Sequence, residues 1–533
     1  MPRSASPGKE MTAVPSQPVP LAHLLDALEP LTIATRHVYN VPVTGVAFDS
    51  RHVNRGDIFV AIPGFKQDGH AFIPQALEKG AAALVTEREV SAPGVPVVRV
   101  KNARRALAIL ACHFFAHPSR ELKVCGITGT NGKTTATTML HAILAASGSG
   151  CGLIGTVEVI TGQQRLPARL TTPEAPEIQA YLREMLATGL RYAVMEVSAQ
   201  GVELERVTGI AFSMGGITNV TTDHLDFYPS PTAYIHTKGR FLAMVPPDKP
   251  VLVNADDPLS LTLARAYHPG SIITYAVDYP ADVTADRLVL GRRGMSFDLT
   301  VHHPLPRPAG GLCGPLRLAV KVPLLGKQNA YNALLAATAA LIAGVTPHTV
   351  THALRSFRGV DRRMQVFRAG ALTIVDDTAL NPASIDAVLA TIRETLGSHK
   401  VTIVYAIRGG RGPEINRRNA VILASWLGRF PGGRLISTSS SGNVGPNDTV
   451  TREEEETFHA TLRRYGIRFN HFAALPVAIA AGLDAARPDG ILLLLGAQGV
   501  DDGARIVFDL LNAEKNIATP EIAFPARVAS PTG

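Results

Sequence analysis

The chain has 533 residues, of which 46% are hydrophobic and 18% charged, and its formal net charge is +8 at pH 7. This length is too great for one ordinary core, and the composition excludes a largely disordered chain, so we expect about three domains. The positive charge suits an acidic substrate or reflects solvated arginines, and the single tryptophan, with no basic tract interleaved with aromatics, does not favour nucleic acid.

The first 20 residues are rich in proline, serine and charge, and we expect them to form a disordered tail. They lack the apolar core of an export signal, and no apolar run of about 18 residues occurs in the chain. We therefore expect a cytoplasmic protein without membrane insertion. The four cysteines lack the spacing of a metal cluster or a disulfide framework and are interpreted as buried thiols: Cys112, Cys125, Cys151 and Cys313.

Residues 21–119 predict a small α/β domain. Short apolar runs alternate with turns in "VTGVAFDSRHVNRGDIFVAIPG" and "AAALVTE", and the domain ends in a helical segment, "ARRALAILACHFFAHPSR". Residues 118–120, "PSR", interrupt this helix before the apolar segment "KVCGIT". A proline at such a point favours a linker between domains.

Residues 120–361 predict a second domain built on a parallel sheet. Apolar runs alternate with helical segments, as a doubly wound sheet with helices on both faces requires: "KVCGIT", "RYAVMEVSA", "FSMGGITNV", "KPVLVNADD" and "GSIITYAV". A third, Rossmann-like α/β domain is predicted for residues 362–533 from "LTIVDD", "KVTIVYAI", "RLISTSS" and "GILLLLGAQG". The fold class is therefore α/β with three domains.

The segment "GITGTNGKTT" predicts a phosphate-binding loop between a strand and a helix that runs to about Ala146. Glycines allow close approach of backbone N–H groups to a phosphate, and the helix N-terminus favours negative charge. Lys133 would then neutralise the terminal phosphates of a nucleotide, and Thr134 would offer its hydroxyl to Mg²⁺. Only two residues separate Gly129 from Gly132, where the usual loop has four, so an incidental glycine turn is the alternative.

Further polar side chains follow the neighbouring predicted strands. Because the carboxyl ends of parallel strands meet at one edge, we expect them to gather near the loop as oxygen ligands for Mg²⁺, with one histidine: Glu196, Asn219, Asp223, His224, Asn254 and Asp256. Each taken singly is also explained as a helix cap or a surface charge.

These motifs resemble the Mur ligases, ATP-dependent amide-forming enzymes of peptidoglycan synthesis. "GTNGKTT" is similar to the family's phosphate loop, "MEVSAQG" to MEVSSHG, "TNVTTDHLDFY" to TN-x-x-DHLD-x-H, "GKQNAYNALLAA" to G-x-x-N-x-x-N-x-L-A-A, and "DRRMQ" to GRM-E. The amino-terminal segment and "LTTPEAPEIQAYL" resemble the MurE branch, which adds the third amino acid to UDP-N-acetylmuramoyl-L-Ala-D-Glu. The close match covers about the first two thirds of the chain.

The resemblance implies roles for particular residues. ATP would be bound by the phosphate loop, an adenine pocket and two residues of the third domain: Gly129, Thr130, Asn131, Gly132, Lys133, Thr134, Thr135, Asn329, Asn332, Arg363 and Asp377. Mg²⁺ would be held by Thr134, Glu196, His224 and Lys238, the last as a carbamate, and Lys133, Lys238 and His224 would be catalytic. The muramoyl substrate would contact Ser50, Arg51, Thr171, Thr172 and Ser198. From the residues alone, Lys238 is expected to be an exposed helix residue.

The implied reaction joins a free amino acid, expected to be a diamino acid, to the UDP-linked muramoyl peptide through an acyl phosphate, in a monomeric enzyme. The third domain departs from the family pattern. Leu380 stands at the histidine position of DYAH-x-P, and DNPR, GKGHE and GGDRD-like segments are replaced by "SSSGNVGPNDTV", "GAQGVDDGAR" and "AIRGGRGPEINRRN". In the last, Arg408, Arg411, Arg417 and Arg418 would bind a carboxylate or phosphate, or are solvated. Asp501 and Asp502 are interpreted as a polar turn, with contact to a cationic side chain as the alternative.

Two alternative functions stay open. The first is a Mur-family ligase redirected to another carboxylate, such as a precursor of a cofactor or storage polymer, which the changed third domain favours and the amino-terminal domain does not. The second is a nucleotide-binding scaffold or regulatory protein. Lys133, Glu196, His224 and Lys238 argue against a scaffold, since it has no need of a complete metal site.

Overall fold

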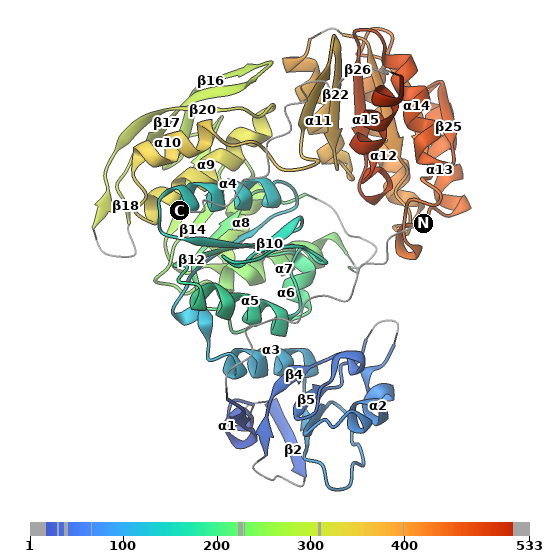
Figure 1. The fold of residues 1–533 in the computed structure, drawn as a ribbon. Helices are drawn as coiled ribbons and strands as arrows, with labels where there is room; N and C mark the ends of the chain where they lie inside the picture. The colour runs from blue at the N-terminus through green and yellow to red at the C-terminus, as the bar shows by residue number, and fades with distance from the viewer. Residues whose placement is uncertain are drawn as a thin grey trace.

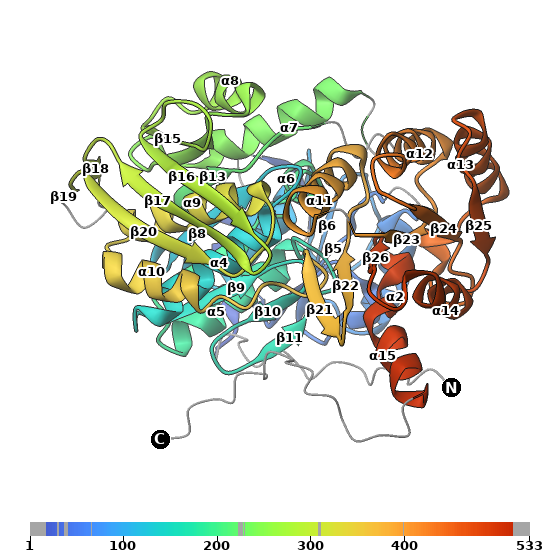
Figure 2. The same ribbon diagram turned by 90° about the horizontal axis from the view of Figure 1, so that it is seen from above.

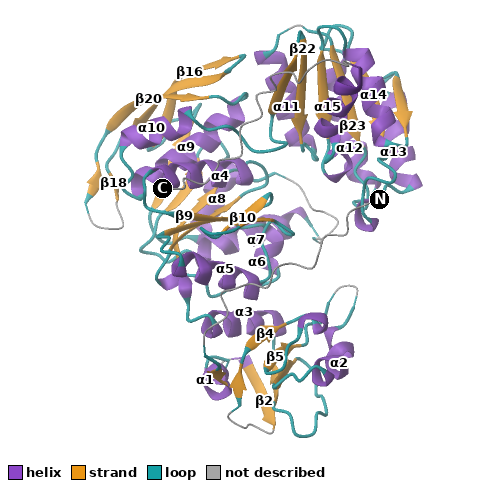
Figure 3. Ribbon diagram, viewed as in Figure 1, coloured by secondary structure: helices purple, strands orange, loops and turns teal. Residues whose placement is uncertain are grey.

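The computed structural model describes residues 17–28, 31–36, 41–64, 67–221, 228, 230–306, 311–397 and 399–514. Figure 1 shows three units along the chain, each with its own sheet, and the sheets have five, eleven and six strands. Helices accompany the strands in every unit (Figure 3). The predicted α/β class with three domains is confirmed.

The amino-terminal unit is a five-stranded sheet in the order β2-β7-β6-β5-β4. Helix α3 (Ala103–Phe114) packs on this sheet, and the Asn102 side chain caps it by accepting a hydrogen bond from the Arg105 N–H. The other elements are α1 (Leu21–Asp26), β1 (Val19–Pro20), β2 (Thr32–Arg36), β3 (Pro42–Val43), β4 (Gly45–Ala47), β5 (Asp57–Val60), α2 (Ile73–Glu78), β6 (Ala83–Thr86) and β7 (Val97–Val100). The predicted interruption at residues 118–120 is a short 3₁₀ helix.

The centre of the eleven-stranded sheet is parallel, as predicted, and runs β9-β12-β8-β13-β14-β15. Strand β8 (Lys123–Thr128) is buried because alternate side chains enter the cores on its two faces: Cys125 and Ile127 on one, Val124 on the other. The remaining central strands are β9 (Cys151–Ile154), β12 (Tyr192–Glu196), β13 (Phe212–Ile217), β14 (Val251–Asn254) and β15 (Ile272–Ala276). The helices are α4 (Lys133–Ala146), α5 (Ala175–Ala187), α6 (Ala199–Glu203), α7 (Pro231–Met244), α8 (Pro258–Tyr267), α9 (Lys327–Ile342) and α10 (Pro347–Arg355).

Both edges of this sheet carry antiparallel strands that the sequence analysis did not predict. At one edge β10 (Glu158–Ile160) and β11 (Arg165–Pro167) follow β9, and at the other β16 (Val283–Gly291) pairs with β17 (Gly294–Val301), which pairs with β20 (Leu316–Val322). Two short strands, β18 (Leu305–Pro306) and β19 (Leu312–Cys313), pair beyond β17. Figure 2 shows β16, β17 and β20 on the side of the central domain away from β23, β24 and β25 of the third.

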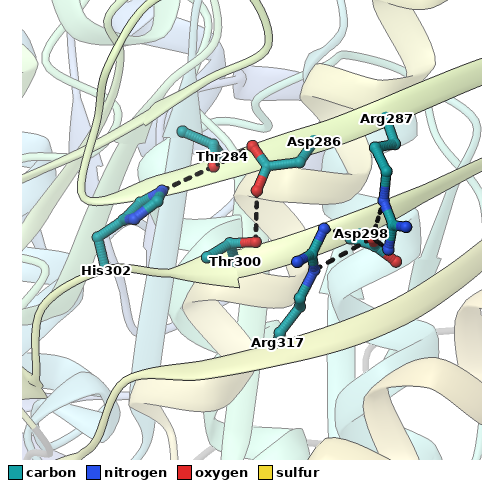
Figure 4. A network of polar contacts seen from close by, with 7 residues as sticks. All are labelled: Thr284, Asp286, Arg287, Asp298, Thr300, His302 and Arg317. Carbon is teal, nitrogen blue, oxygen red and sulfur yellow. Dashed lines mark hydrogen bonds and ion pairs between the residues drawn. The ribbon is translucent and has the colours of Figure 1, made fainter.

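Strand β17 shows why this edge is antiparallel. Its buried residues alternate with partly exposed ones, which is the pattern of a sheet covered on one face only. On the other face polar side chains pair across strands (Figure 4): Asp298 binds Arg287 and Arg317, while Asp286 accepts hydrogen bonds from Thr284 and Thr300. These cross-strand pairs stabilise the register of β16, β17 and β20.

The third unit is a six-stranded sheet in the order β21-β22-β26-β23-β24-β25, in which only β21 (Gln365–Ala369) is antiparallel. Strand β26 (Ile491–Leu495) lies at its centre and is buried along its whole length. The other elements are β22 (Leu372–Asp377), α11 (Pro382–Thr395), β23 (Val401–Ala406), α12 (Pro413–Leu427), β24 (Arg434–Thr438), α13 (Arg452–Arg464), β25 (Phe469–Phe472), α14 (Leu475–Ala486) and α15 (Gly503–Glu514).

Among the described residues, no helix is both long enough and apolar enough to cross a membrane. All four cysteines are free and buried, as predicted, and burial raises the pKa of the Cys112 and Cys125 thiols to about 12.

Candidate active site

The predicted phosphate loop joins β8 to α4, and its two glycines are required by the backbone. Gly129 has φ +139°, and a Cβ atom there would lie 1.9 Å from Thr218 Oγ1. Gly132 has φ +88°, and a Cβ atom there would lie 2.5 Å from Asn332 Oδ1. Neither position has room for a side chain, so the unusual spacing of the glycines reflects a specific loop shape and not an incidental turn.

The segment after β13 holds this loop in place. Because β13 is a parallel neighbour of β8, its carboxyl end lies next to the loop. The N–H groups of Thr130 and Asn131 donate to the Asn219 carbonyl (2.8 Å) and to Asn219 Oδ1 (3.0 Å), and Thr218 Oγ1 donates to the Asn131 carbonyl (2.6 Å). Asn219, predicted as an oxygen ligand, therefore fastens the phosphate loop.

Two lysines meet at the first residue of the loop. Lys133 Nζ donates to the carbonyls of Gly129 (2.9 Å) and Thr130 (3.0 Å), and Lys238 Nζ donates to the same Gly129 carbonyl at 2.7 Å. Lys238 lies on α7 and is 1% exposed, with its ammonium 4.6 Å from the centre of the Tyr234 ring. The expectation from the residues alone, that Lys238 is exposed, is wrong, because α7 packs this side chain beneath the loop.

Glu196 lies on the other side of the loop, at the end of β12, and is fully buried. Its carboxylate accepts hydrogen bonds from Thr134 Oγ1 (2.9 Å), the Thr156 N–H (2.6 Å) and Thr156 Oγ1 (3.0 Å). A carboxylate and hydroxyls beside a helix N-terminus are the hard oxygen ligands that Mg²⁺ prefers, so these residues fit the predicted ion.

A cavity of about 160 Å³ opens beside Glu196. Its walls come from α4, from the β9–β10 turn, from Arg165 on β11 and from residues 359–361, which lead into the third unit. Thr134 and Glu196 both line it. Two of the predicted metal ligands, Thr134 and Glu196, therefore border a space large enough for small polar groups, bounded by the segment that joins the second and third units.

The two threonines of "LTTP" contact Thr156 and the backbone of Glu196. Thr171 Oγ1 accepts a hydrogen bond from Thr156 Oγ1 (3.1 Å), and Thr172 Oγ1 donates to the Glu196 carbonyl (2.9 Å). Arg206, which the sequence analysis did not single out, fastens this segment by donating to the Thr172 carbonyl (3.0 Å) and pairing with Glu174 (2.7 Å). Ser198 caps α6 by accepting the Gly201 N–H.

The remaining predicted residues of the first two units lie as follows. Asn332 Nδ2 donates to Asn329 Oδ1 (3.0 Å); both asparagines are buried on α9, and Asn332 lies next to Gly132. Ser50 is buried and donates to Gln75 Oε1 (2.7 Å), whereas Arg51 is exposed and pairs with Asp49. Ser50 and Arg51 therefore belong to the amino-terminal unit and not to the group around the loop.

Two further predicted ligands act as loop anchors. The Asp256 carboxylate accepts the N–H groups of Val277, Asp278 and Tyr279 and the Tyr331 hydroxyl. Asn254 Nδ2 donates to the Thr218 carbonyl (3.0 Å). Their interpretation as ligands for Mg²⁺ is therefore not supported by their contacts. Asp223 and His224 lie outside the described residues.

The third unit contacts the phosphate loop through Asn381, the residue before α11. Asn381 Nδ2 donates to Asn131 Oδ1 at 3.3 Å, while its Oδ1 caps α11 by accepting the Ser384 N–H. Asp377, at the end of β22, is buried and accepts the Met364 N–H (2.7 Å), and burial raises the pKa of its carboxyl. Its ionised form is favoured by the nearby charge of Arg363.

The arginine-rich segment after β23 is occupied by contacts within its own domain. Arg417 and Arg418 both pair with Glu414, and their hydrogen bonds lower the pKa of that carboxyl to about 2. Arg411 pairs with Asp448, and the N–H groups of Gly410, Arg411 and Gly412 converge on Glu454. Arg408 Nη1 donates to the Leu380 carbonyl (3.2 Å). Of the four arginines, Arg408 is therefore the one that contacts the residue next to Asn381.

Comparison with known proteins identifies the family to which this chain belongs. Family models described as the Mur ligase middle domain, the catalytic domain of the Mur ligase family, and the glutamate ligase domain of Mur ligases match residues 127–340, 42–115 and 362–498. A UDP-N-acetylmuramyl-tripeptide synthetase of Roseiflexus sp. strain RS-1 is 36% identical over 475 residues, which are 86% of this chain and 90% of that protein. The chain belongs to the Mur ligase family.

Other Mur ligases give the same picture. The UDP-N-acetylmuramoyl-L-alanyl-D-glutamate–2,6-diaminopimelate ligase of Bacillus licheniformis is 36% identical over 399 residues, covering 72% of this chain and 78% of its own. The crystal structure of MurF from Acinetobacter baumannii has a TM-score of 0.68 at 20% identity and covers 94% of this chain and all of that one, which shows a shared fold. The resemblance to Mur ligases of the MurE type is thus confirmed.

As a Mur ligase, this chain contains contacts that the motifs did not reveal. Thr156 completes the group around Glu196, Asn381 links the third domain to the phosphate loop, and Arg206 supports Thr172. Thr156 follows "LIG" without any recognisable pattern. Arg206, in contrast, lies in a turn two residues after Leu204 with its side chain 11% exposed, and its contacts could be recognised only once the packing was known.

Proposed function

We propose that this chain is an ATP-dependent ligase that joins an amino acid, preferably a diamino acid, to the D-glutamyl carboxylate of UDP-N-acetylmuramoyl-L-Ala-D-Glu. The observation that supports this most directly is the group formed by Lys133, Thr134 and Glu196 around one phosphate loop, next to Thr171 and Thr172. The names of the relatives supply the substrates. A carboxylate is a poor electrophile, so it must be activated before an amine can displace oxygen from it.

The first step transfers the γ-phosphoryl group of ATP to the acceptor carboxylate and yields an acyl phosphate. Backbone N–H groups of the loop and the N-terminus of α4 would bind the phosphates, and Lys133 would stabilise the charge that spreads over the transferring group. Mg²⁺, when bound by Thr134 and Glu196 together with His224, would neutralise phosphate charge there. Asn329 and Asn332 would line the adenine pocket, with Thr135 and the loop residues completing the ATP site.

Lys238 would act in this reaction as a carbamate. A buried ammonium is costly to keep beside bound cations, and an uncharged lysine reacts with CO₂ to give a carbamate and a proton. The carbamate would place a negative group beneath the phosphate loop, next to Lys133, where it could supply oxygen ligands to a divalent cation. Its burial at 1% exposure supports this role.

The second step is attack of the amine on the acyl phosphate, which forms the amide and releases phosphate. Thr171, Thr172 and Ser198 would position the muramoyl peptide near Glu196, and Ser50 and Arg51 would contact the uridine nucleotide in the amino-terminal domain. Arg363 and Asp377 would approach ATP from the third domain, whose contact through Asn381 would keep water from the acyl phosphate. We infer a monomeric enzyme, with every proposed role assigned to one chain.

The proposal is tested by phosphate release from ATP and Mg²⁺ with the muramoyl dipeptide and a panel of amino acids that includes diaminopimelate, lysine and ornithine. Release should require both the dipeptide and one amino acid. Lys133→Ala provides the inactive control, and Arg51→Ala should raise the KM for the dipeptide without changing that for ATP. Release that is independent of the dipeptide would contradict the proposed acceptor.

One observation favours a second candidate with the same chemistry on another carboxylate. The segments that the family uses for the amino acid differ here, and the segment after β24 is held by its own domain, since Ser440 Oγ donates to the Gly499 carbonyl (2.6 Å). In this second candidate, ATP still activates a carboxylate of the substrate, at the site next to Glu196. This candidate would be favoured if no phosphate were released with the muramoyl dipeptide and phosphate were released with another polyanionic carboxylate.

A further inference from the structure

Arg362, at the entry to the third domain, gathers acceptors from two distant parts of the chain. Its guanidinium donates to Asp376 Oδ1 (3.2 Å), to the carbonyls of Ala497 (3.2 Å) and Gly496 (2.5 Å), and to Asp501. The Arg362 side chain is 13% exposed and Asp376 is 1% exposed, so this contact is shielded from water, whereas Asp501 is 65% exposed. Asp501, interpreted above as part of a polar turn, therefore meets a cation of its own chain.

The backbone at this position is unusual for an arginine. Arg362 has φ +57°, a conformation that glycine adopts without cost and other residues adopt only with strain. In the alignment of "DRRMQ" with GRM-E, Arg362 occupies the position of the glycine. The chain thus places a long cationic side chain at a position whose geometry suits glycine, and the four contacts of the guanidinium offset that strain.

The burial of Asp376, the acid that Arg362 contacts, costs free energy. Asp376 is 1% exposed, and its Oδ2 atom has no hydrogen-bond partner within the part of the chain that the structure describes. Burial raises the pKa of Asp376 to about 6, even though Arg362 favours its ionised form. Strain and an incompletely paired buried acid in one cluster indicate a role other than stability.

The cluster fixes the loop after β26, at the carboxyl edge of the sheet after which Asn381 also lies. The loop after β26, residues 496–501, is held by Arg362 on one side and by the Gly496 N–H, which donates to the Asp377 carbonyl (3.2 Å), on the other. The Arg362 carbonyl in turn accepts the Thr378 N–H (3.0 Å). Three residues later in the chain, Asn381 contacts the phosphate loop.

Loops at the carboxyl ends of parallel strands form the ligand sites of such sheets, and the loop after β26 is one of them in this domain. The acyl phosphate would form at the phosphate loop of the central domain, so the attacking amine must be presented from this edge. A displacement of about 1 Å in such a presenting loop is enough to lower the rate of a bimolecular step strongly.

We propose that Arg362 is a positioning residue for the amino-acid substrate: by tying Gly496, Ala497 and Asp501 to the entry of the third domain, it holds the loop after β26 where the incoming amine binds. This inference rests on the proposed ligase function. It assigns Arg362 no contact with ATP and none with the muramoyl peptide.

The test separates the two half-reactions in Arg362→Gly, which keeps the backbone unstrained and removes the tie. Acyl-phosphate formation, trapped as a hydroxamate by hydroxylamine in place of the amino acid, should stay within about twofold of the wild type. The KM for the amino acid should rise about tenfold or more, while the KM values for ATP and the dipeptide change by less than about twofold. Arg362→Lys should recover part of the loss, because one donor cannot replace the fork of a guanidinium.

Two controls keep the result interpretable. Arg505→Ala removes an exposed arginine from the next helix, where it pairs with Asp502 and Asp509, and should leave all three KM values unchanged. Arg362→Gly combined with Asp376→Asn removes the buried acid that the single variant leaves unpaired, so the KM effect can be measured in a folded enzyme.

An amino-acid KM that is unchanged in both Arg362 variants would overturn the inference, and so would an equal loss of hydroxamate and amide formation, which indicates a general structural role. A wild-type enzyme that makes hydroxamate from the dipeptide but no amide with any amino acid would contradict the proposed function and this inference with it.

Discussion

Replacement of Gly129 by alanine tests whether the shape of the phosphate loop is what binds ATP. The new Cβ atom would lie 1.9 Å from Thr218 Oγ1, and the backbone would have to keep φ +139° with a side chain present. The backbone term costs roughly 1–2 kcal/mol and the overpacking about 1–3 kcal/mol, so the native loop is disfavoured by about 2–5 kcal/mol.

The strain can be relieved only by moving Thr218 or the loop. Thr218 Oγ1 holds the Asn131 carbonyl at 2.6 Å, so either movement changes the orientation of the N–H groups that would bind phosphate. We therefore expect Gly129→Ala to weaken ATP binding by about tenfold or more, which corresponds to roughly 1.4 kcal/mol of the strain appearing in the bound state.

Gly148→Ala is a matched control beyond the other end of α4. Gly148 follows α4 with φ +75°, and nothing lies within 4 Å of a Cβ atom built there. It should lower the free energy of unfolding by about 1 kcal/mol and leave ATP binding unchanged. Titration calorimetry with ATP and urea denaturation measure the two effects. Wild-type ATP affinity in Gly129→Ala, or an equal loss in Gly148→Ala, would refute the reasoning.

Three further results are expected. Lys133→Ala should abolish amide formation, because no other group of the loop replaces its charge at the phosphates; full phosphate release in this variant would remove the assigned ATP site. Lys238→Ala should lower kcat by about a hundredfold and make the rate insensitive to added bicarbonate, and a preserved rate would exclude the carbamate. Burial raises the pKa of Asp376 to about 6, so the folded protein holds this proton more tightly than the unfolded chain does. The folded protein is therefore stabilised below the ordinary pKa of the carboxyl, and this stability is lost as the pH rises through 6. Urea denaturation should show the free energy of unfolding falling by about 3 kcal/mol between about pH 4 and pH 6, a fall that Asp376→Asn should lack.

The parallel core was predictable from the sequence because its strands are continuous apolar runs. "KVCGIT" and "GILLLLGAQG" coincide with β8 and β26, which are buried on both faces and leave no polar alternation to confuse the pattern. The antiparallel edge was not predicted. Strands β17 and β20 alternate in "GMSFDLTV" and "LRLAVKV", but β16 has a mixed pattern, and the pairing of the three strands depends on contacts such as Arg317 with Asp298.

The candidate site was predicted in part, for similar reasons. Lys133, Thr134 and Glu196 follow directly from a strand, a glycine loop and a helix, whose geometry is local. Lys238 could not be placed, because its burial depends on how α7 packs beneath a loop 109 residues earlier in the chain. Arg362 was equally hidden, since its partners Asp376 and Asp501 are separated along the chain and only the fold brings them together.

The most direct test of the proposed function is the mass of the product. The purified protein would be incubated with ATP, Mg²⁺, UDP-N-acetylmuramoyl-L-Ala-D-Glu and the panel of amino acids, and the nucleotide-linked products would be analysed by mass spectrometry. We predict one new species, heavier than the dipeptide substrate by one amino acid less one water, that appears only with ATP and is absent with Lys133→Ala. An unchanged dipeptide with every amino acid, from protein that binds ATP, would contradict the assigned acceptor and amine.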